Sequence, residues 1–490
     1  MSPAAAVDSD VLDTPAAGGM VVRGSALRFG SYASVIALSV VSAAVLTRHL
    51  GRVSFGQYTT VISLAAVVSS VTDAGMSALG TREYAMRSGA ERDALMRDLL
   101  GLRVALTLIG VLIATAFALI AGYPPALLAG TALAALAVVV MVFQHTLSIP
   151  LTTRLRLGYL SGLEVARQAV TGVLLVGLVL LGAGVLPLLA VALVANLLLL
   201  PPTAALVRGE ISMRMSIRPR RWVKLLRLTV AFSLASAANT IYLFTAQIIT
   251  SLVASGVQSG LFAASFRIFI ALAAIPGILV TVSLPVLARA ARDDRARLSY
   301  ALQRTFEASM LVGMAAAIAV IGGARFMIAV VAGPEYAAAA DALRIEGGVL
   351  LASFVLAGWG FGLLALHRHR AMLLANLAAL AVSSILTVIL ARADGARGAA
   401  LASVCGETTL ALLYLVGLIR GSPELRPELG AAAKIVLAAI PALAVALLPG
   451  IAQLLQPIAA LAVFAVLIVL MRAVPREVYE LIPPRLRRAP

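Results

Sequence analysis

Residues 125–148 read PALLAGTALAALAVVVMVFQHTLS, an almost wholly apolar stretch that follows Tyr123-Pro124 and contains no Asp, Glu, Lys or Arg. A helix that crosses the hydrocarbon core of a bilayer needs about 20 mostly apolar residues. This stretch therefore predicts a membrane-spanning helix.

Similar stretches recur along nearly the whole chain of 490 residues, which is 61% hydrophobic and 12% charged, with a mean hydropathy of +1.01. A soluble domain cannot bury that much apolar surface. We predict an all-α integral membrane protein with about fourteen transmembrane helices. The expected spans are 26–47, 57–78, 99–121, 125–148, 163–182, 184–205, 228–252, 261–285, 308–331, 346–366, 371–391, 398–419, 435–450 and 456–472.

Lys and Arg are distributed unequally between the loops expected on the two sides of the membrane. The net charge is +17, and Lys and Arg concentrate in alternate loops, above all in residues 206–227 and 289–304. Cytoplasmic loops of membrane proteins carry this excess, so we predict that both termini are cytoplasmic and that no nucleic acid is bound. The expected outer loops contain Arg48, Arg52, Arg325, Arg344, Arg392 and Arg397.

The long basic loop divides the spans into two lobes of six helices each, with two extra helices after the second lobe. The predicted units are a disordered cytoplasmic tail (1–24), an N-lobe (25–205), a basic cytoplasmic linker (206–227), a C-lobe (228–419), helices 13 and 14 (435–472) and a basic cytoplasmic tail (473–490). The two lobes would be parallel repeats related by a pseudo-two-fold axis along the membrane normal. A weak echo supports this repeat, because Gly56 and Gly260 both stand two residues before an aromatic residue in a glycine-containing outer turn.

Polar residues form stripes on two expected helices. On a helical projection, the seventh span places Ser233, Ser236, Asn239, Thr240, Gln247 and Thr250 within an arc of about 120°. The second span gathers Thr59, Ser63, Ser70, Asp73 and Ser77 in the same way. Small hydroxyl residues also permit close helix packing, but amides in hydrocarbon require partners or water. We therefore expect these stripes to line a water-filled cavity between the lobes.

Ionisable residues at membrane depth cost about 2.5–3.5 kcal/mol each on insertion scales. Glu407, near the middle of the twelfth span, and Asp73, in the second, are candidates for ion coupling; the alternative is a protonated or paired carboxyl. Glu164 and Arg167 are spaced to pair with each other. Arg103 is expected to snorkel to the nearby membrane surface.

Arg267 differs from these residues, because it lies inside the eighth span with no acid within a helical turn. It could bind an anionic group of a substrate. Its competing role is structural, as a partner for Asp73 or Glu407 across the bundle.

The sequence argues against an enzyme. Neither Lys224 nor Lys434 follows the glycine of a phosphate-binding Gly-x-x-x-x-Gly-Lys-Ser/Thr loop. No His-Glu-x-x-His or paired-Cys pattern is present, His367 and His369 are interpreted as topological charge, and the single cysteine, Cys405, permits no disulfide framework. We expect no cofactor and no metal.

Four ordered motifs resemble those of the polysaccharide flippases of the multidrug/oligosaccharidyl-lipid/polysaccharide exporter superfamily. They are Arg48-His-Leu-Gly51-x4-Gly56-Gln-Tyr58, Asp73-x-Gly75 running to Arg82-Glu-Tyr-Ala85, Gly333-Pro-Glu-Tyr336 with Leu343-Arg-Ile345, and Gly395-Ala-Arg-Gly398-Ala-Ala. The resemblance covers most of the chain.

This resemblance implies a V-shaped transporter that carries undecaprenyl-diphosphate-linked oligosaccharides across the bacterial cytoplasmic membrane by alternating access. Membrane lipids and the polymerase or ligase machinery of surface polysaccharides would be its partners. Arg267 is similar in placement to the cations that hold the diphosphate in murein-precursor flippases. The candidate substrate-binding residues are Arg267, Arg48, Asn239, Gln247, Ser233 and Ser236. The alternatives are a drug/cation antiporter of the same superfamily, a lipid II flippase and, from other classes, a membrane-embedded glycosyltransferase or a scaffold.

Overall fold

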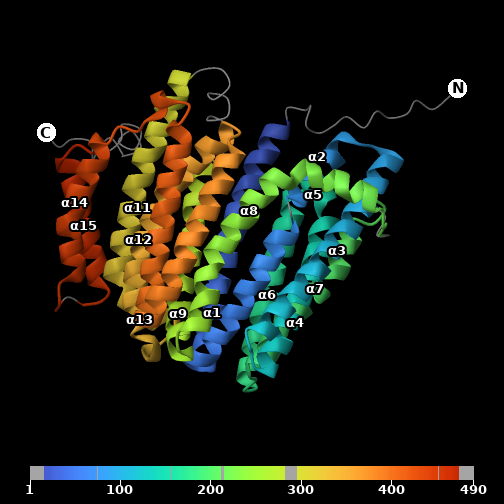
Figure 1. Ribbon diagram of the computed structural model, residues 1–490, viewed down its shortest axis with the longest axis horizontal. Coiled ribbons are helices and arrows are strands. Elements are labelled where there is room, and N and C mark those ends of the chain that lie inside the picture. Colours follow the sequence, from blue (N-terminus) through green and yellow to red (C-terminus); the bar gives the residue numbers. More distant parts are fainter. Residues whose placement is uncertain are drawn as a thin grey trace.

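The computed structural model describes residues 16–73, 75–154, 156–210, 215–281, 295–450 and 452–473, and within these ranges it is helical with no strand (Figure 1). The first half contains α1 (Ala16–Asp73), α2 (Met76–Met86), α3 (Gly89–Ile120), α4 (Pro125–Leu147), α5 (Ile149–Thr153), α6 (Leu157–Leu180) and α7 (Val185–Leu206). The second half contains α8 (Pro219–Val253), α9 (Gly256–Thr281), α11 (Arg295–Val331), η2 (Pro334–Tyr336), α12 (Ala339–Ala365), α13 (His369–Ile419), η3 (Pro423–Leu425), α14 (Gly430–Leu447) and α15 (Leu455–Leu470).

The helices agree with the fold predicted from hydropathy. In the described part of the chain, 10 helices are long and apolar enough to cross a membrane, and α15 is a shorter apolar helix. Two of the long helices each contain a break: α1 at Gly51 (φ 68°) and α13 at Asp394 and Gly395 (φ 55°). Glycine adopts such positive φ values without steric cost. Both breaks fall between expected spans, and the number of fourteen membrane crossings stays a prediction.

The helices form two groups that meet at the centre of the molecule (Figure 1). Helices α3, α4, α6 and α7 lie on one side, α11, α12 and α13 lie on the other, and α14 with α15 forms the far edge. Helix α1 contacts both halves. It packs against α4 and α6 of the first half and against α8 and α9 of the second half. Most of the two expected tails, residues 1–15 and 474–490, lies outside the described residues.

Backbones meet directly where the two halves join. A Cβ atom on Gly56 of α1 would lie 2.8 Å from the nitrogen of Gly260 in α9, and a Cβ on Gly260 would lie 1.8 Å from the carbonyl oxygen of Arg52. These glycines are the two positions that the sequence echo pairs. A pseudo-two-fold axis brings equivalent residues together in this way, so the contact supports the predicted repeat.

Further contacts close the same end of the bundle, here called the Gly51 end because the Gly51 and Gly395 breaks lie there. The Thr47 hydroxyl donates to the Val331 carbonyl oxygen over 3.0 Å. The Tyr336 hydroxyl donates to the Thr47 carbonyl oxygen over 3.3 Å, and its ring lies edge-on to Phe55 with centroids 6.2 Å apart. The two halves are therefore joined by both polar and apolar contacts at this end.

A glycine-to-alanine substitution tests this junction. We expect Gly260→Ala to lower the apparent Tm of the purified protein, because the added methyl group meets backbone that cannot move aside; overpacking typically costs about 1–3 kcal/mol. Gly177→Ala is the matched control, since nothing lies within 4 Å of its added Cβ. Thermal unfolding in detergent measures both variants. Equal stability of Gly260→Ala and the parent protein would show that the halves are not held at this point.

Candidate functional site

A cavity of about 610 Å³ lies among the helices of the first half and reaches α8. Its wall is formed by α1, α3, α4, α6 and α7, with Ser236 of α8 closing one side. The uncharged polar residues that line it are Ser69, Ser70, Ser77, Gln168, Thr171, Asn196 and Ser236. Apolar residues, among them Ile62, Val138 and Met141, form much of the remaining wall, so the lining is mixed. We call this space the N-lobe cavity.

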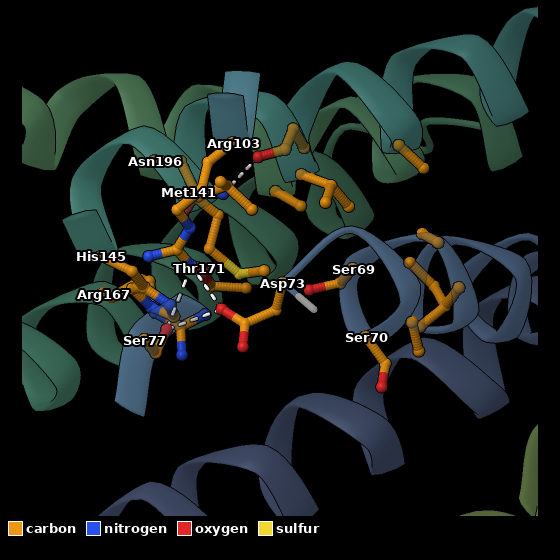
Figure 2. A pocket seen from close by; sticks show the side chains of 18 of the residues that line it. Ser69, Ser70, Asp73, Ser77, Arg103, Met141, His145, Arg167, Thr171 and Asn196 are labelled. Atoms are coloured by element: carbon orange, nitrogen blue, oxygen red, sulfur yellow. Dashed lines mark hydrogen bonds and ion pairs between the residues drawn. The ribbon is translucent and has the colours of Figure 1, made fainter. Parts of the chain in front are cut away.

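Charged residues gather at one end of the N-lobe cavity (Figure 2). Arg103 donates from Nη2 to Asp73 Oδ1 at 2.5 Å and to Ser77 Oγ at 3.1 Å, and Ser77 in turn donates to Asp73 Oδ1 over 2.6 Å. Arg103 is only 1% exposed, so the expectation that it snorkels to the surface is wrong. It stays buried because Asp73 compensates its charge across the α1–α3 contact. Asp73 is therefore held in an ion pair, which the sequence had left as the alternative to ion coupling.

The second ion pair of this region is Arg167 with Glu164, which confirms the pairing predicted from their spacing. Arg167 and His145 line the N-lobe cavity and also a neighbouring cavity of about 450 Å³. Figure 2 shows both side chains beside the Arg103 group. One end of the N-lobe cavity thus carries a histidine and two arginines, and the charge of each arginine is compensated by a carboxylate.

Another cavity lies in the other half, and we call it the C-lobe cavity. Below, the N-lobe and C-lobe cavities are together called the two large cavities, apart from the cavity of about 450 Å³ beside the first. It measures about 370 Å³ and is lined by Ser236 and Asn239 of α8, two of the expected substrate contacts. Its remaining wall is mainly apolar and aromatic, including Phe269 and Phe361. Ser236 lines both large cavities, so they adjoin at this residue of α8.

Glu407 borders the C-lobe cavity and is 6% exposed. Its carboxylate accepts a hydrogen bond from the Tyr242 hydroxyl at 2.8 Å and another from the Ser353 hydroxyl at 2.6 Å. These two uncharged hydroxyls satisfy the hydrogen-bonding capacity of the carboxylate but do not compensate its negative charge. In the described part of the chain, no ion pair is formed by Glu407, so the pairing alternative with a cation is not observed.

Glu346 is a buried acid that sequence reasoning missed. It is 1% exposed, and neither carboxyl oxygen has a hydrogen-bond partner among the described residues. Together with Glu407 it lines a cavity of about 20 Å³. The expected tenth span began at this residue, whereas α12 begins about two turns earlier, at Ala339. An earlier helix start would have revealed it as an intramembrane acid.

Arg267 lies apart from the two large cavities, between α9 and α1. Its Nη2 donates to Ser39 Oγ at 3.1 Å, and it borders a cavity of about 30 Å³ with Tyr58 and Thr59. The described residues contain no carboxylate paired with it, so the alternative pairing with Asp73 or Glu407 is not formed. Arg267 is therefore a guanidinium between the two halves that no acid of the described ranges neutralises.

Two expected substrate contacts, Gln247 and Arg48, do not line a large cavity. Gln247 is fully buried and donates to Thr60 Oγ1 at 3.3 Å and Ser259 Oγ at 3.4 Å, so it ties α8 to α1 and α9. Arg48 donates to the carbonyl oxygens of Val330 (2.7 Å) and Ala329 (3.4 Å), where the unpaired carbonyls at the end of α11 attract a cation. The side chain of Ser233 lies outside the described residues.

The fold is shared with solved transporter structures. The Lipid II flippase MurJ in an inward closed conformation matches with a TM-score of 0.76 at 13% identity, covering 92% of this chain and 99% of that one. An inward-facing multidrug resistance MATE family transporter of the MOP superfamily matches with a TM-score of 0.62 at 15% identity, covering 80% and 94%. A MOP superfamily transporter from Pyrococcus furiosus matches with a TM-score of 0.54 at 17% identity, covering 83% and 95%.

None of the curated proteins matches the chain significantly. The model of the polysaccharide biosynthesis protein family, however, matches residues 45–341. This match takes in more than half of the sequence and includes α3 to α9 together with the Gly51 end. The protein is thus a multi-pass membrane protein with the fold of the MOP superfamily, and it belongs to the polysaccharide biosynthesis protein family.

Proposed function

We propose that this protein is a flippase that moves an undecaprenyl-diphosphate-linked oligosaccharide from the cytoplasmic to the outer leaflet of a bacterial cytoplasmic membrane. Family membership supports a role in polysaccharide biosynthesis. The fold supports transport, because the solved structures that share it are named as flippases and transporters. Lipid-linked glycan and membrane lipids are then its partners, with polymerase or ligase machinery acting on the product.

The observation that carries the proposal is the unneutralised charge of Arg267. Keeping a cation among packed helices without an acid costs free energy, and a transporter gains from that cost when an anionic substrate supplies the missing charge. A guanidinium binds phosphate oxygens in a bidentate manner and stays charged in a low-dielectric site. The diphosphate of the lipid carrier is the group that fits this chemistry.

The two large cavities support alternating access. The halves are joined at the Gly51 end, and the cavities lie away from that junction. With cytoplasmic termini, the Gly51 end faces outward and the cavities serve the inward side of the cycle. We assign the oligosaccharide to the hydroxyl-lined wall that includes Ser236. We assign Asn239, which lines the C-lobe cavity, to the edge of the same binding site.

We further propose that Glu407 couples transport to an ion gradient. It lies between the C-lobe cavity and the small cavity that it shares with Glu346, and its two donors are neutral hydroxyls. A carboxylate in this position can take up a proton or a cation without first breaking an ion pair. Asp73 is a weaker candidate, because Arg103 already supplies its countercharge.

A lipid II flippase is the second candidate. The observation that favours it is the match of the whole fold to a protein of that name, which covers 92% of this chain. The two candidates differ in the glycan and share the diphosphate. Chemical identification of the lipid-linked intermediate that accumulates in a deletion strain separates them.

Substitution of Arg267 tests the diphosphate contact. We expect Arg267→Ala to reduce flipping by about tenfold to hundredfold, since a hydrogen bond to a charged group contributes about 1.5–3 kcal/mol, while Arg267→Lys retains part of the activity. Export of glycan in a deletion strain measures flipping, with protein in the membrane fraction quantified in parallel. Arg397→Ala, which alters an exposed arginine paired with Asp394, is the control. Normal export by Arg267→Ala would exclude the anchoring role.

Substitution of Glu407 tests ion coupling. Glu407→Gln preserves the size of the side chain and one accepting oxygen, but its amide nitrogen donates and the side chain cannot bind a proton. We expect transport by this variant to lose its dependence on the proton or sodium gradient, measured in vesicles with an imposed gradient. Glu424→Gln in η3 is the control. Full gradient dependence in Glu407→Gln would remove this residue from the coupling mechanism.

Side-specific labelling tests the orientation. We expect cysteines introduced at the exposed positions Glu424 and Glu335 of the Cys405→Ser protein to react from opposite sides of the membrane, with position 424 accessible from the cytoplasm. The Lys and Arg asymmetry generates this expectation. Labelling of intact cells and of inverted vesicles with an impermeant maleimide reads it out, and reaction of both sites from one side would reject the orientation.

A further inference from the structure

The chain segment that leads into α8 is fixed to the first half of the protein. Asp98 of α3, which is buried, accepts hydrogen bonds from the Ser216 hydroxyl and from Arg221, the latter at 3.3 Å. The Ser216 nitrogen also donates to the Arg97 carbonyl oxygen at 3.1 Å. A Cβ on Gly101 would lie 2.2 Å from the Ser216 oxygen. These contacts hold the beginning of α8 closely against α3.

The first turns of α8 have two opposite faces. Trp222, Leu225 and Leu226 pack into the apolar cluster formed with α2 and α3. Arg220, Lys224 and Arg227 follow one another at spacings of four and three residues, which places them on one stripe about 180° from the packed face. All three are exposed. The docked face thus orients a basic stripe away from the protein.

Exposed apolar side chains flank this basic stripe. Val223 is 47% exposed and Leu228 is 68% exposed, and the preceding Ile217 is 81% exposed. Exposed apolar groups next to Lys and Arg are typical of helices that lie at the interface between headgroups and acyl chains. Figure 1 shows the beginning of α8 running past the ends of the first-half helices near α2 and α5, before the helix continues between the two halves.

The nearby acids do not neutralise the stripe. Asp98 is occupied by Ser216 and Arg221, and Glu210 pairs with Arg154 and Arg156. Throughout the described ranges, no ion pair involves Arg220, Lys224 or Arg227. The stripe therefore presents three charges that an external anion can satisfy.

We propose that the basic stripe of α8 (Arg220, Lys224 and Arg227) is a binding surface for the phosphate headgroups of anionic membrane lipids. The flanking Val223 and Leu228 contact the adjoining acyl chains while the cations bind the headgroups. The proposal depends on the membrane-embedded fold and not on the transported substrate. The surface is connected to the two large cavities through α8, because the same helix continues to Ser236 and Asn239.

A tryptophan introduced at Val223, which is exposed beside the stripe, provides a local probe of this surface once the chain's two tryptophans, Trp222 and Trp359, are replaced by Phe. This parent protein is placed in nanodiscs that contain equal mole fractions of brominated phosphatidylglycerol or brominated phosphatidylcholine. Bromine quenches nearby indoles, and the indole at position 223 is then the one observed. We expect stronger quenching by the anionic lipid, and we expect salt to reduce the difference because it screens exposed charges.

The decisive comparison is a triple variant, Arg220→Gln with Lys224→Gln and Arg227→Gln. Each cation near an anionic surface contributes about fivefold in affinity, so the triple variant should lose the extra quenching by phosphatidylglycerol. The matched control neutralises three exposed arginines near the Gly51 end, Arg325→Gln, Arg392→Gln and Arg397→Gln, and should keep it. Equal quenching by the two lipids in the parent protein, or extra quenching that survives in the triple variant, would overturn the proposal.

Discussion

The contact between the backbones of Gly56 and Gly260 is the interaction on which the arrangement of the site depends. It joins the two halves at one end, where Thr47, Phe55 and Tyr336 add hydrogen bonds and an aromatic contact. Because side chains are absent from the point of closest approach, the helices cross there without a wedge between them. The large cavities lie farther along the same helices, where the polar residues of α1 and α8 no longer pack against one another completely.

Compensation of charge separates structural from functional groups inside this fold. Arg103 and Arg167 each have a carboxylate partner, so their positive charges are neutralised within the protein. Among the described residues, Arg267 has no carboxylate partner, and Glu346 and Glu407 have no cationic partner. A charged group among packed helices that lacks an opposite charge has a cost that packing alone does not repay. Under the function proposed above, these three are the groups on which an anionic substrate or a coupling ion would act.

The fold was largely predictable because hydropathy and glycine positions are local signals. Most expected spans fall on one helical segment, although the second crosses from α1 into α2 and the eighth extends past Thr281, where the described residues stop. Gly51 and Gly395 mark breaks that hydropathy alone would place only roughly. The site was less predictable, because a helical projection gives the face of a residue but not the helix that covers it. Gln247 lies on the predicted polar face of α8 yet meets Thr60 and Ser259, and Arg103 meets an acid 30 positions away in sequence. Such partners depend on tertiary packing.

The position of Ser236 on both large cavities has a thermodynamic consequence. Ser236 lies at a point of α8 that both cavities reach, so a displacement of α8 changes the shape of both at once. A group that binds in one cavity and shifts α8 therefore alters binding in the other, and linkage requires the effect to be equal in both directions. One helix shared by two cavities is in this way sufficient to couple them without any contact between their ligands.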